Sequence, residues 1–203
     1  VALGSEALRY TTTGGNIAVG AGALRGAVSG NTGYDNIAIG YNAMVNAVLP
    51  TYNIAIGRAV LSNVSAGSEN VAIGYNAMQA GTNANYSVAV GHQALKAAQG
   101  NQNTAVGYKA GISQTSPSNN TLVGYQAGTF ITTGGGNTVV GAGAGYSVVT
   151  GSGNTLIGAG ADHGSATSLN NQTIIGSGAG VVLKHSDTLL ETEHNISSGG
   201  NIT

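Results

Sequence analysis

The sequence predicts an all-β protein, a parallel β-solenoid or β-roll of about eleven rungs with about 17 residues in each. Three observations support this fold. A short word ending in glycine, of the form N-x-A-[IV]-G, recurs along the chain at that spacing. The residues before each glycine are Ile, Val, Thr and Ala, bounded by Gly, Asn and Ser, which is typical of short strands. No segment carries apolar residues at helical spacing.

Each repeat is anchored on its last glycine, and the spacing from one anchor to the next varies little along the chain. A unit therefore holds a short strand, the glycine, a second short segment and a loop of variable length. Stacked units pair the same residue types at about 4.8 Å per rung, so eleven rungs make a rod on the order of 50 Å long. The anchor glycines are Gly4, Gly20, Gly40, Gly57, Gly74, Gly91, Gly107, Gly124, Gly141, Gly158 and Gly176.

The repetitive β-roll is expected over residues 1–180, with a change of rung type near 104–120, and a non-repetitive cap or junction over 181–203. After Gly180 the repeat stops and charged residues cluster, as expected where a solenoid must cover its terminal strand edge. Because the chain opens inside a repeat, at VALG, we expect more of the rod upstream.

Alternation of side chains in a strand separates the repeat into two faces. The residues three and one before the anchor glycine, such as Ile54 and Ile56, share one face, which we expect to be buried. Asparagine and alanine, such as Asn53 and Ala55, occupy the opposite face. A coil with so short a period has one interior of its own, so the second apolar face requires a partner. Oligomerisation is therefore expected.

The apolar volume changes columns partway along the chain. Four residues after the glycine, Leu and Met up to Leu95 give way to Gly111, Gly128 and Gly145. In exchange, the alanine column becomes large from Leu122 onward. Conservation of core volume in a close-packed interior predicts this exchange, and indicates one architecture with two packing solutions.

The words NVAIGYNAM (70–78), NTAVGYKAG (103–111) and NTLVGYQAG (120–128) resemble the N-x-A-[IV]-G-Y repeats of bacteriophage tail fibres. They are also similar to the repeats of trimeric autotransporter adhesin heads. The resemblance covers residues 1–180 and implies a homotrimeric β-roll that projects from a particle or cell and contacts a host surface. The units of this chain are longer than the repeats of adhesin heads, which favours the phage family.

An asparagine begins eight of the ten full repeats, which favours a structural ladder over a ligand site, because stacked amides hydrogen-bond their copies above and below. The ladder positions are Asn16, Asn36, Asn53, Asn70, Asn103, Asn120, Asn137 and Asn154. The anchor glycines indicate a positive φ or a close backbone approach, not a phosphate site.

Tyrosines supply the candidate receptor-binding residues. Some directly follow the anchor glycine, in a column that also holds Arg58 and His92 and is therefore expected to be exposed. Others lie in the loops before strands, where binding residues concentrate. The tyrosines either stack against sugars or simply cover rung edges. The candidates are Tyr34, Tyr41, Tyr52, Tyr75, Tyr86, Tyr108 and Tyr125.

Several function classes find no support in the sequence. The net charge of -1 gives no basis for nucleic-acid binding, and no apolar stretch approaches the length of a membrane span. The seven carboxylates suggest no acid–base pair, so we expect no enzyme, no cofactor and no metal site. The threonine rank from Thr104 to Thr173 suggests an ice-binding face, but such faces need a second threonine rank, and here the neighbour is Val or Ile.

The sequence thus predicts a homotrimeric tail-fibre rod of a virion, located extracellularly, that mediates or supports attachment to a host cell. Its expected partners are copies of itself, a host surface glycan or protein, and other virion tail proteins, with neither nucleic acid nor membrane insertion. The alternatives are the head of a bacterial trimeric adhesin at the cell surface, and a self-stacking filament without receptor binding.

Overall fold

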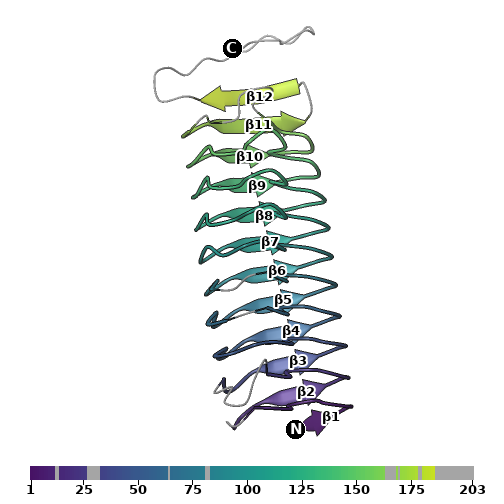
Figure 1. Cartoon of the computed structure of the whole chain (residues 1–203). Coiled ribbons are helices and arrows are strands. Elements are labelled where there is room, and N and C mark those ends of the chain that lie inside the picture. The colour runs from purple at the N-terminus through teal and green to yellow at the C-terminus, as the bar shows by residue number, and fades with distance from the viewer. Residues whose placement is uncertain are drawn as a thin grey trace, which may run out of the picture.

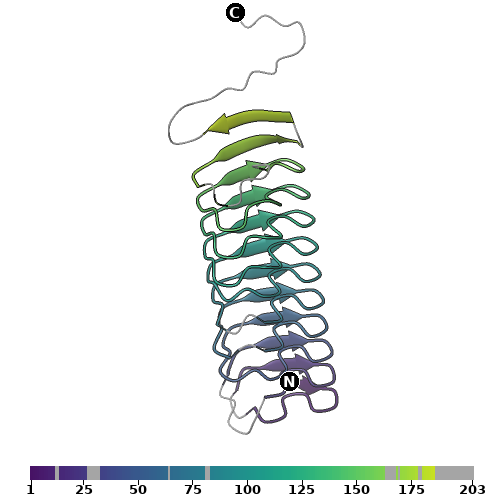
Figure 2. The same cartoon turned by 45° about the horizontal axis from the view of Figure 1, so that its top comes forward.

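The computed structural model describes residues 1–11, 14–26, 33–63, 65–80, 83–162, 168, 170–177 and 180–185, the last segment as backbone alone. The chain winds into a coil whose turns stack into a rod (Figure 1). From a tilted viewpoint the turns superimpose as a pile of similar loops (Figure 2). The described residues contain no helix, and the predicted parallel β-solenoid is confirmed.

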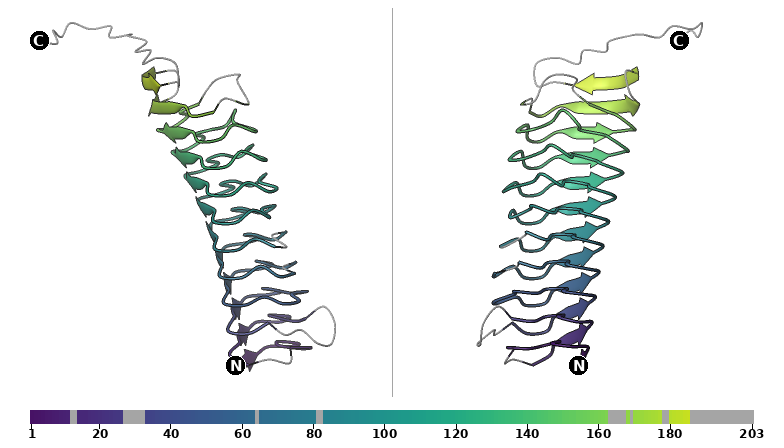
Figure 3. Two further views of the ribbon diagram at one scale, coloured as in Figure 1. Left: turned by 90° about the vertical axis from the view of Figure 1, so that its left-hand side faces the viewer. Right: turned by 45° about the vertical axis from the view of Figure 1, so that its right-hand side comes forward.

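Each turn contributes one short strand to a single sheet whose strand order follows the sequence. The strands line one side of the rod, and turns and loops form the rest (Figure 3). They are β1 (Ala2–Leu3), β2 (Ile17–Val19), β3 (Ile37–Ile39), β4 (Ile54–Ile56), β5 (Val71–Ile73), β6 (Val88–Val90), β7 (Thr104–Val106), β8 (Thr121–Val123), β9 (Thr138–Val140), β10 (Thr155–Ile157), β11 (Thr173–Ser177) and β12 (Gly180–His185).

The strands from β1 to β11 are parallel and pair equivalent repeat positions, so that Ala55 of β4 lies between Ala38 of β3 and Ala72 of β5. The last strand differs, because β12 runs antiparallel to β11. Its backbone covers the edge that β11 would otherwise leave unpaired, at the start of the segment for which a cap or junction is expected. Residues 186–203 lie outside the described part of the chain.

The two strand faces lie the opposite way from the sequence prediction. The second residue of each strand from β2 to β11 points into the coil and is buried, as is the asparagine before most of these strands. The Ile and Val residues at the first and third strand positions point outward, and Ile39 is 37% exposed. A narrow coil accounts for this difference, because buried Leu and Met side chains from the turn opposite already fill the interior. Alanine fits in the space that remains.

Different residues fill the interior in the two halves of the rod. Leu24, Met44, Leu61, Met78 and Leu95 fill it in the first half of the rod and are all essentially inaccessible. A Cβ at Gly111 would lie 2.7 Å from Leu122 Cδ1, and one at Gly128 would lie 2.8 Å from Leu122 Cδ2. These glycines therefore make room for the larger strand residues, and buried Ile131 and Val148 add volume from a further column.

Gln114 lies at the junction of the two packing types. Its own rung has alanine at the strand position (Ala105) and glycine at the turn position (Gly111), so neither column fills the centre. The Gln114 side chain occupies this space, is fully buried, and has no hydrogen-bond partner for Nε2 or Oε1. An amide buried without partners lowers the stability of the fold.

The buried asparagines join each rung to the next. The backbone N–H of Asn53 donates to Oδ1 of Asn36 at 3.0 Å, and the Asn70 N–H donates to Oδ1 of Asn53 at 3.0 Å. Most of the amide nitrogens donate in turn to a carbonyl in the following loop, as Asn53 Nδ2 does to Gly67 at 2.9 Å. Ser87 replaces an asparagine and keeps the chain of bonds, since its Oγ accepts from the Asn103 N–H at 3.1 Å.

The anchor glycines form the corner after each strand. Gly74 has φ +130°, a conformation that side-chain-bearing residues rarely adopt, and a Cβ there would lie 2.5 Å from the Gly91 carbonyl oxygen. Every added side chain at this corner would therefore push two rungs apart.

We predict that Gly74→Ala lowers the free energy of unfolding by about 2–5 kcal/mol, the sum of backbone strain and overpacking. Gly14→Ala is the matched control, because a Cβ at Gly14 meets nothing within 4 Å. Its expected effect is within about 0.5 kcal/mol. Chemical denaturation followed by circular dichroism measures both, and equal effects would contradict the close approach at the corner.

We also predict that Gln114→Leu raises the free energy of unfolding by about 1–2 kcal/mol, because it removes a buried amide without partners at similar volume. Exposed Gln99 supplies the control, since Gln99→Leu buries nothing new. The comparison uses the same denaturation assay. A loss of stability in Gln114→Leu would mean that the amide has a bonding role.

Candidate functional site

The outer face of the sheet is the side of the strands that points away from the coil. We define it by the first and third residues of strands β2–β7 and the corresponding positions of β8–β11; most are Ile or Val, with Thr at the first position from β7 onward. All are half-buried or exposed, and the most accessible of the Ile and Val side chains, such as Val106 and Ile157, are 37–39% exposed. Apolar surface of this kind is typical of interaction sites.

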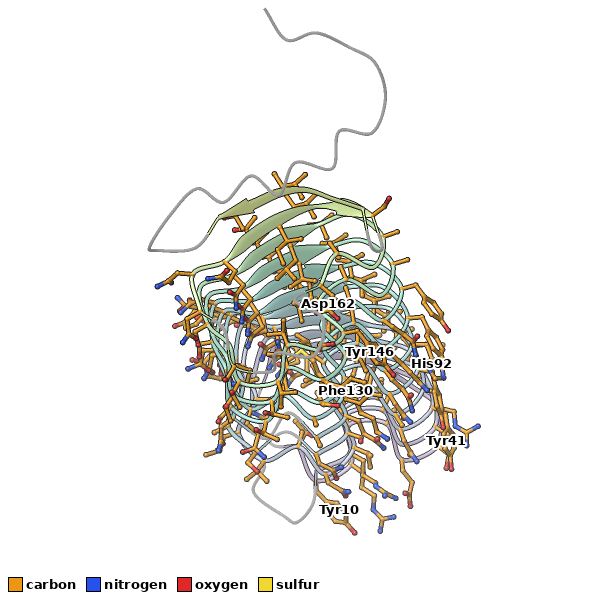
Figure 4. The ribbon with its side chains drawn as sticks, turned by 90° about the horizontal axis from the view of Figure 1, so that it is seen from above. Tyr10, Tyr41, His92, Phe130, Tyr146 and Asp162 are labelled. Atoms are coloured by element: carbon orange, nitrogen blue, oxygen red, sulfur yellow. The ribbon has the colours of Figure 1, made fainter. Side chains whose placement is uncertain are left out.

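A column of large side chains follows one edge of the outer face. This post-strand column consists of the residues directly after the anchor glycines, and Tyr41 and His92 mark it in Figure 4. The tyrosines in it are 38–55% exposed. Its large members are Tyr41, Arg58, Tyr75, His92, Tyr108 and Tyr125.

Neighbours in the post-strand column stack on one another. The His92 ring lies between Tyr75 and Tyr108, with centroid distances of 5.2 and 5.1 Å, and Tyr108 stacks on Tyr125 at 5.2 Å with planes 9° apart. The Arg58 guanidinium lies 5.4 Å from the Tyr41 ring and 5.9 Å from the Tyr75 ring. Ring faces are therefore covered within the column, which presents ring edges and hydroxyl groups outward. A sugar could stack only on a ring at the end of the column.

A second column follows the opposite edge of the outer face. This pre-strand column consists of the residues five before the anchor glycines. From Asp35 to Asn119 they all have φ between 55° and 64°. The left-handed conformation turns the chain into the strand, although it costs tyrosine and glutamate more than glycine. The large members are Asp35, Tyr52, Glu69, Tyr86, Gln102 and Asn119.

A hollow of about 440 Å³ lies where the pre-strand column meets the outer face. Tyr52 and Glu69 line it from the column, and Ile54 and Val71 line it from the strands. Tyr34 stands beside it, with its ring 5.4 Å from that of Tyr52 in an edge-to-face arrangement. The hollow thus combines apolar walls, a phenol and a carboxylate.

Electrostatics around this hollow favour the neutral form of Tyr52. A side-chain hydrogen bond with Tyr34 raises the pKa of Tyr52, and the nearby charges of Asp35 and Glu69 act in the same direction. Within the described residues neither carboxylate forms an ion pair, because the ion pairs there all belong to Glu6, with Arg9 and Arg25. Those two arginines lower the pKa of Glu6, with Arg25 the larger cause.

The structure places the seven candidate tyrosines on two edges of one face. Tyr41, Tyr75, Tyr108 and Tyr125 share the post-strand column, whereas Tyr52 and Tyr86 belong to the pre-strand column and Tyr34 lies beside it. The asparagine column is buried away from both edges. Sequence reasoning missed the pairing of Phe130 with Tyr146, whose rings lie 4.7 Å apart (Figure 4). Their different offsets from the anchor glycines concealed it.

Two features are absent from the part of the chain that the structure describes. Within the described ranges, no three His, Cys, Asp or Glu side chains gather closely enough to hold a metal ion. The same part of the chain contains no helix capable of crossing a bilayer.

Comparison with family models, with curated proteins and with solved structures found no match for the chain. The features that bear on function are therefore the outer face and its two flanking columns.

The hydrogen bond between Tyr34 and Tyr52 gives a testable titration. Because it is the largest cause that raises the pKa of Tyr52, we predict that Tyr34→Phe lowers that pKa. The pKa of Tyr52 is higher in the folded chain than in the unfolded chain, so the neutral phenol contributes to stability at pH values below the unfolded-state pKa. That contribution is lost as the pH rises through the folded-state pKa. NMR of ring-labelled tyrosine measures the shift, with Tyr86→Phe as the control. An unchanged Tyr52 pKa in Tyr34→Phe would exclude this bond.

Proposed function

We propose that the chain forms a homotrimeric, extracellular rod of a virion tail fibre, which mediates or supports attachment to a host cell surface. The observation that carries the proposal is the apolar outer face. The coil fills its own interior with alanine, leucine and methionine, yet the same strands turn Ile and Val outward along the whole rod. Strands that are apolar on both faces are typical of sheets covered on both sides.

Threefold association about an axis along the rod would cover this face in all copies at once. The number three comes from the resemblance of words such as NVAIGYNAM (70–78) to tail-fibre repeats. A stack of backbone-paired rungs with covered sheets suits a stiff particle appendage. Attachment to the host would use the exposed tyrosines or loops, through contact with a glycan or protein.

The adhesin head remains the second candidate, because it shares the repeat and the same requirement for lateral cover. Growth into an end-to-end filament is less favoured. The β12 strand runs antiparallel on β11 and occupies the edge to which another parallel rung would have to add.

The assembly is tested by one pair of neighbouring substitutions. Ile56 is half-buried on the outer face, whereas Ala55 beside it is fully buried inside the coil. We predict that the wild type sediments at three times the 19.8 kDa chain mass. Ile56→Asp should sediment as a single chain with a retained β spectrum, because three carboxylates would meet at the axis. Ala55→Asp should unfold instead. A single-chain mass for the wild type would exclude the trimer.

Host attachment is tested separately with the labelled rod, incubated with intact bacteria and with purified surface glycans. If the cells or glycans retain more of the trimeric wild type than of Ile56→Asp, the result would support receptor binding. A trimer that binds no surface would leave it the role of a shaft, and a single-chain protein that binds none would contradict the proposal.

A further inference from the structure

The two columns beside the outer face change size together along the rod. Where the post-strand residue is Ala21, Ala142 or Ala159, the pre-strand residue of the same rung is glycine, at Gly15, Gly136 or Gly153. In the six rungs between Gly40 and Gly124, both positions carry large or polar side chains. The coincidence covers nine consecutive rungs, so both columns respond to one constraint.

Contact within one chain does not explain this coincidence. The two columns lie at opposite ends of each strand, six residues apart, as Asp35 and Tyr41 are. Extended backbone rises about 3.3 Å per residue, so the two columns lie at most about 20 Å apart, on either side of the strand and the glycine corner. A constraint that acts on both edges therefore comes from outside the chain.

The chemistry of the columns differs in a complementary way. The post-strand column carries donors, namely tyrosine hydroxyl groups, Arg58 and His92, and contains no carboxylate. The pre-strand column carries the carboxylates of Asp35 and Glu69, the amides of Gln102 and Asn119 and the phenols of Tyr52 and Tyr86, and contains no cation. A twofold contact between like columns would bring carboxylate to carboxylate. A cyclic contact brings unlike columns together.

We propose that the post-strand column of one copy packs against the pre-strand column of the next copy, rung for rung, wherever two copies meet in the assembly. This inference rests on the proposed trimer and specifies its contacts. Rotation about an axis parallel to the rod keeps equivalent rungs at equal height, so residues of the same rung face one another.

Rung-for-rung contact gives each charged group a partner. Tyr41 faces Asp35 of the next copy and Tyr75 faces Glu69, which pairs phenol hydroxyl groups with carboxylates. Arg58 faces Tyr52 at the hollow that Tyr52, Ile54, Glu69 and Val71 line. Asp35 and Glu69 lie one rung below and one rung above, at about 4.8 Å each. The guanidinium thus meets an aromatic ring and two carboxylates that no cation among the described residues of their own chain neutralises.

Farther along the rod, Tyr108 faces Gln102, and Tyr125 faces Asn119. In both rungs a phenol hydroxyl group can donate to the amide oxygen of the neighbouring copy. In the next two rungs, Ala142 faces Gly136 and Ala159 faces Gly153. Small residues on both sides let the backbones of neighbouring copies approach. The contact between neighbouring copies is therefore polar and broad in the middle of the rod and narrow toward β9 and β10.

Engineered disulfides test the contact, because the chain contains no cysteine. The double variant Tyr125→Cys/Asn119→Cys places thiols in facing positions of one rung. The control Tyr125→Cys/Tyr86→Cys places them two rungs apart, beyond the Cα separation of about 7 Å that a disulfide allows. After mild oxidation, we expect a covalent three-chain band from the first variant on a denaturing gel, and at least tenfold less from the control.

The outcomes separate this inference from the proposed trimer. A trimeric mass without the covalent band, or equal yields from both variants, would overturn the rung-for-rung contact and leave the trimer standing. A single-chain mass for the wild type would remove both.

Charge reversal provides a second measurement that needs no disulfide. Arg58→Glu should weaken association by at least tenfold, since it places a carboxylate between Asp35 and Glu69 of the neighbour. Adding Glu69→Arg in the same chain should restore it. The two residues lie on opposite edges of one chain, so the rescue acts between copies. Lys96→Glu, outside both columns, should have no effect, and failure of the rescue would count against the contact.

Discussion

The whole rod depends on the close stacking of one rung on the next at a single corner and a single ladder. At the corner, glycine backbone approaches glycine backbone so closely that no Cβ fits, as at Gly74 and Gly91. On the inner side of the strands, the asparagines of the ladder, such as Asn36, accept a hydrogen bond from a backbone N–H of the next rung, and amide nitrogens such as that of Asn53 hold the following loop. Because both devices repeat in almost every turn, loops can vary in length without changing the height of a rung.

The sequence was sufficient to predict the solenoid, because a period of Ile, Val and Gly determines which residues pair across rungs whatever the loops do. It also predicted a change of rung type near residues 104–120, since volume lost at Gly111 and Gly128 must reappear elsewhere in a packed interior. It did not reveal which face lies inside. Ile54 and Ala55 are both apolar, and only the width of the coil, set by the inward Leu and Met side chains, decides between them.

The candidate site was predicted less completely. The column of Tyr41, Tyr75, Tyr108 and Tyr125 follows directly from the repeat, because each residue keeps a constant offset from its glycine. Its internal stacking, which covers the ring faces a sugar would use, depends on rung spacing and rotamers. The hollow at Tyr52 and Glu69 is formed by two consecutive repeats. The pattern of a single repeat therefore does not predict it.

The direction of the backbone hydrogen bonds also bears on how the rod carries load. The strands lie across the rod, so the bonds between rungs point along its axis, as the bond from the Ile54 N–H to the Asn70 carbonyl does. Tension applied at the two ends would then break the hydrogen bonds between rungs one rung at a time. Compression would press the anchor glycine of one rung against that of the next. A single chain therefore unfolds rung by rung from its ends under tension, and an appendage that is pulled needs lateral neighbours to share the force.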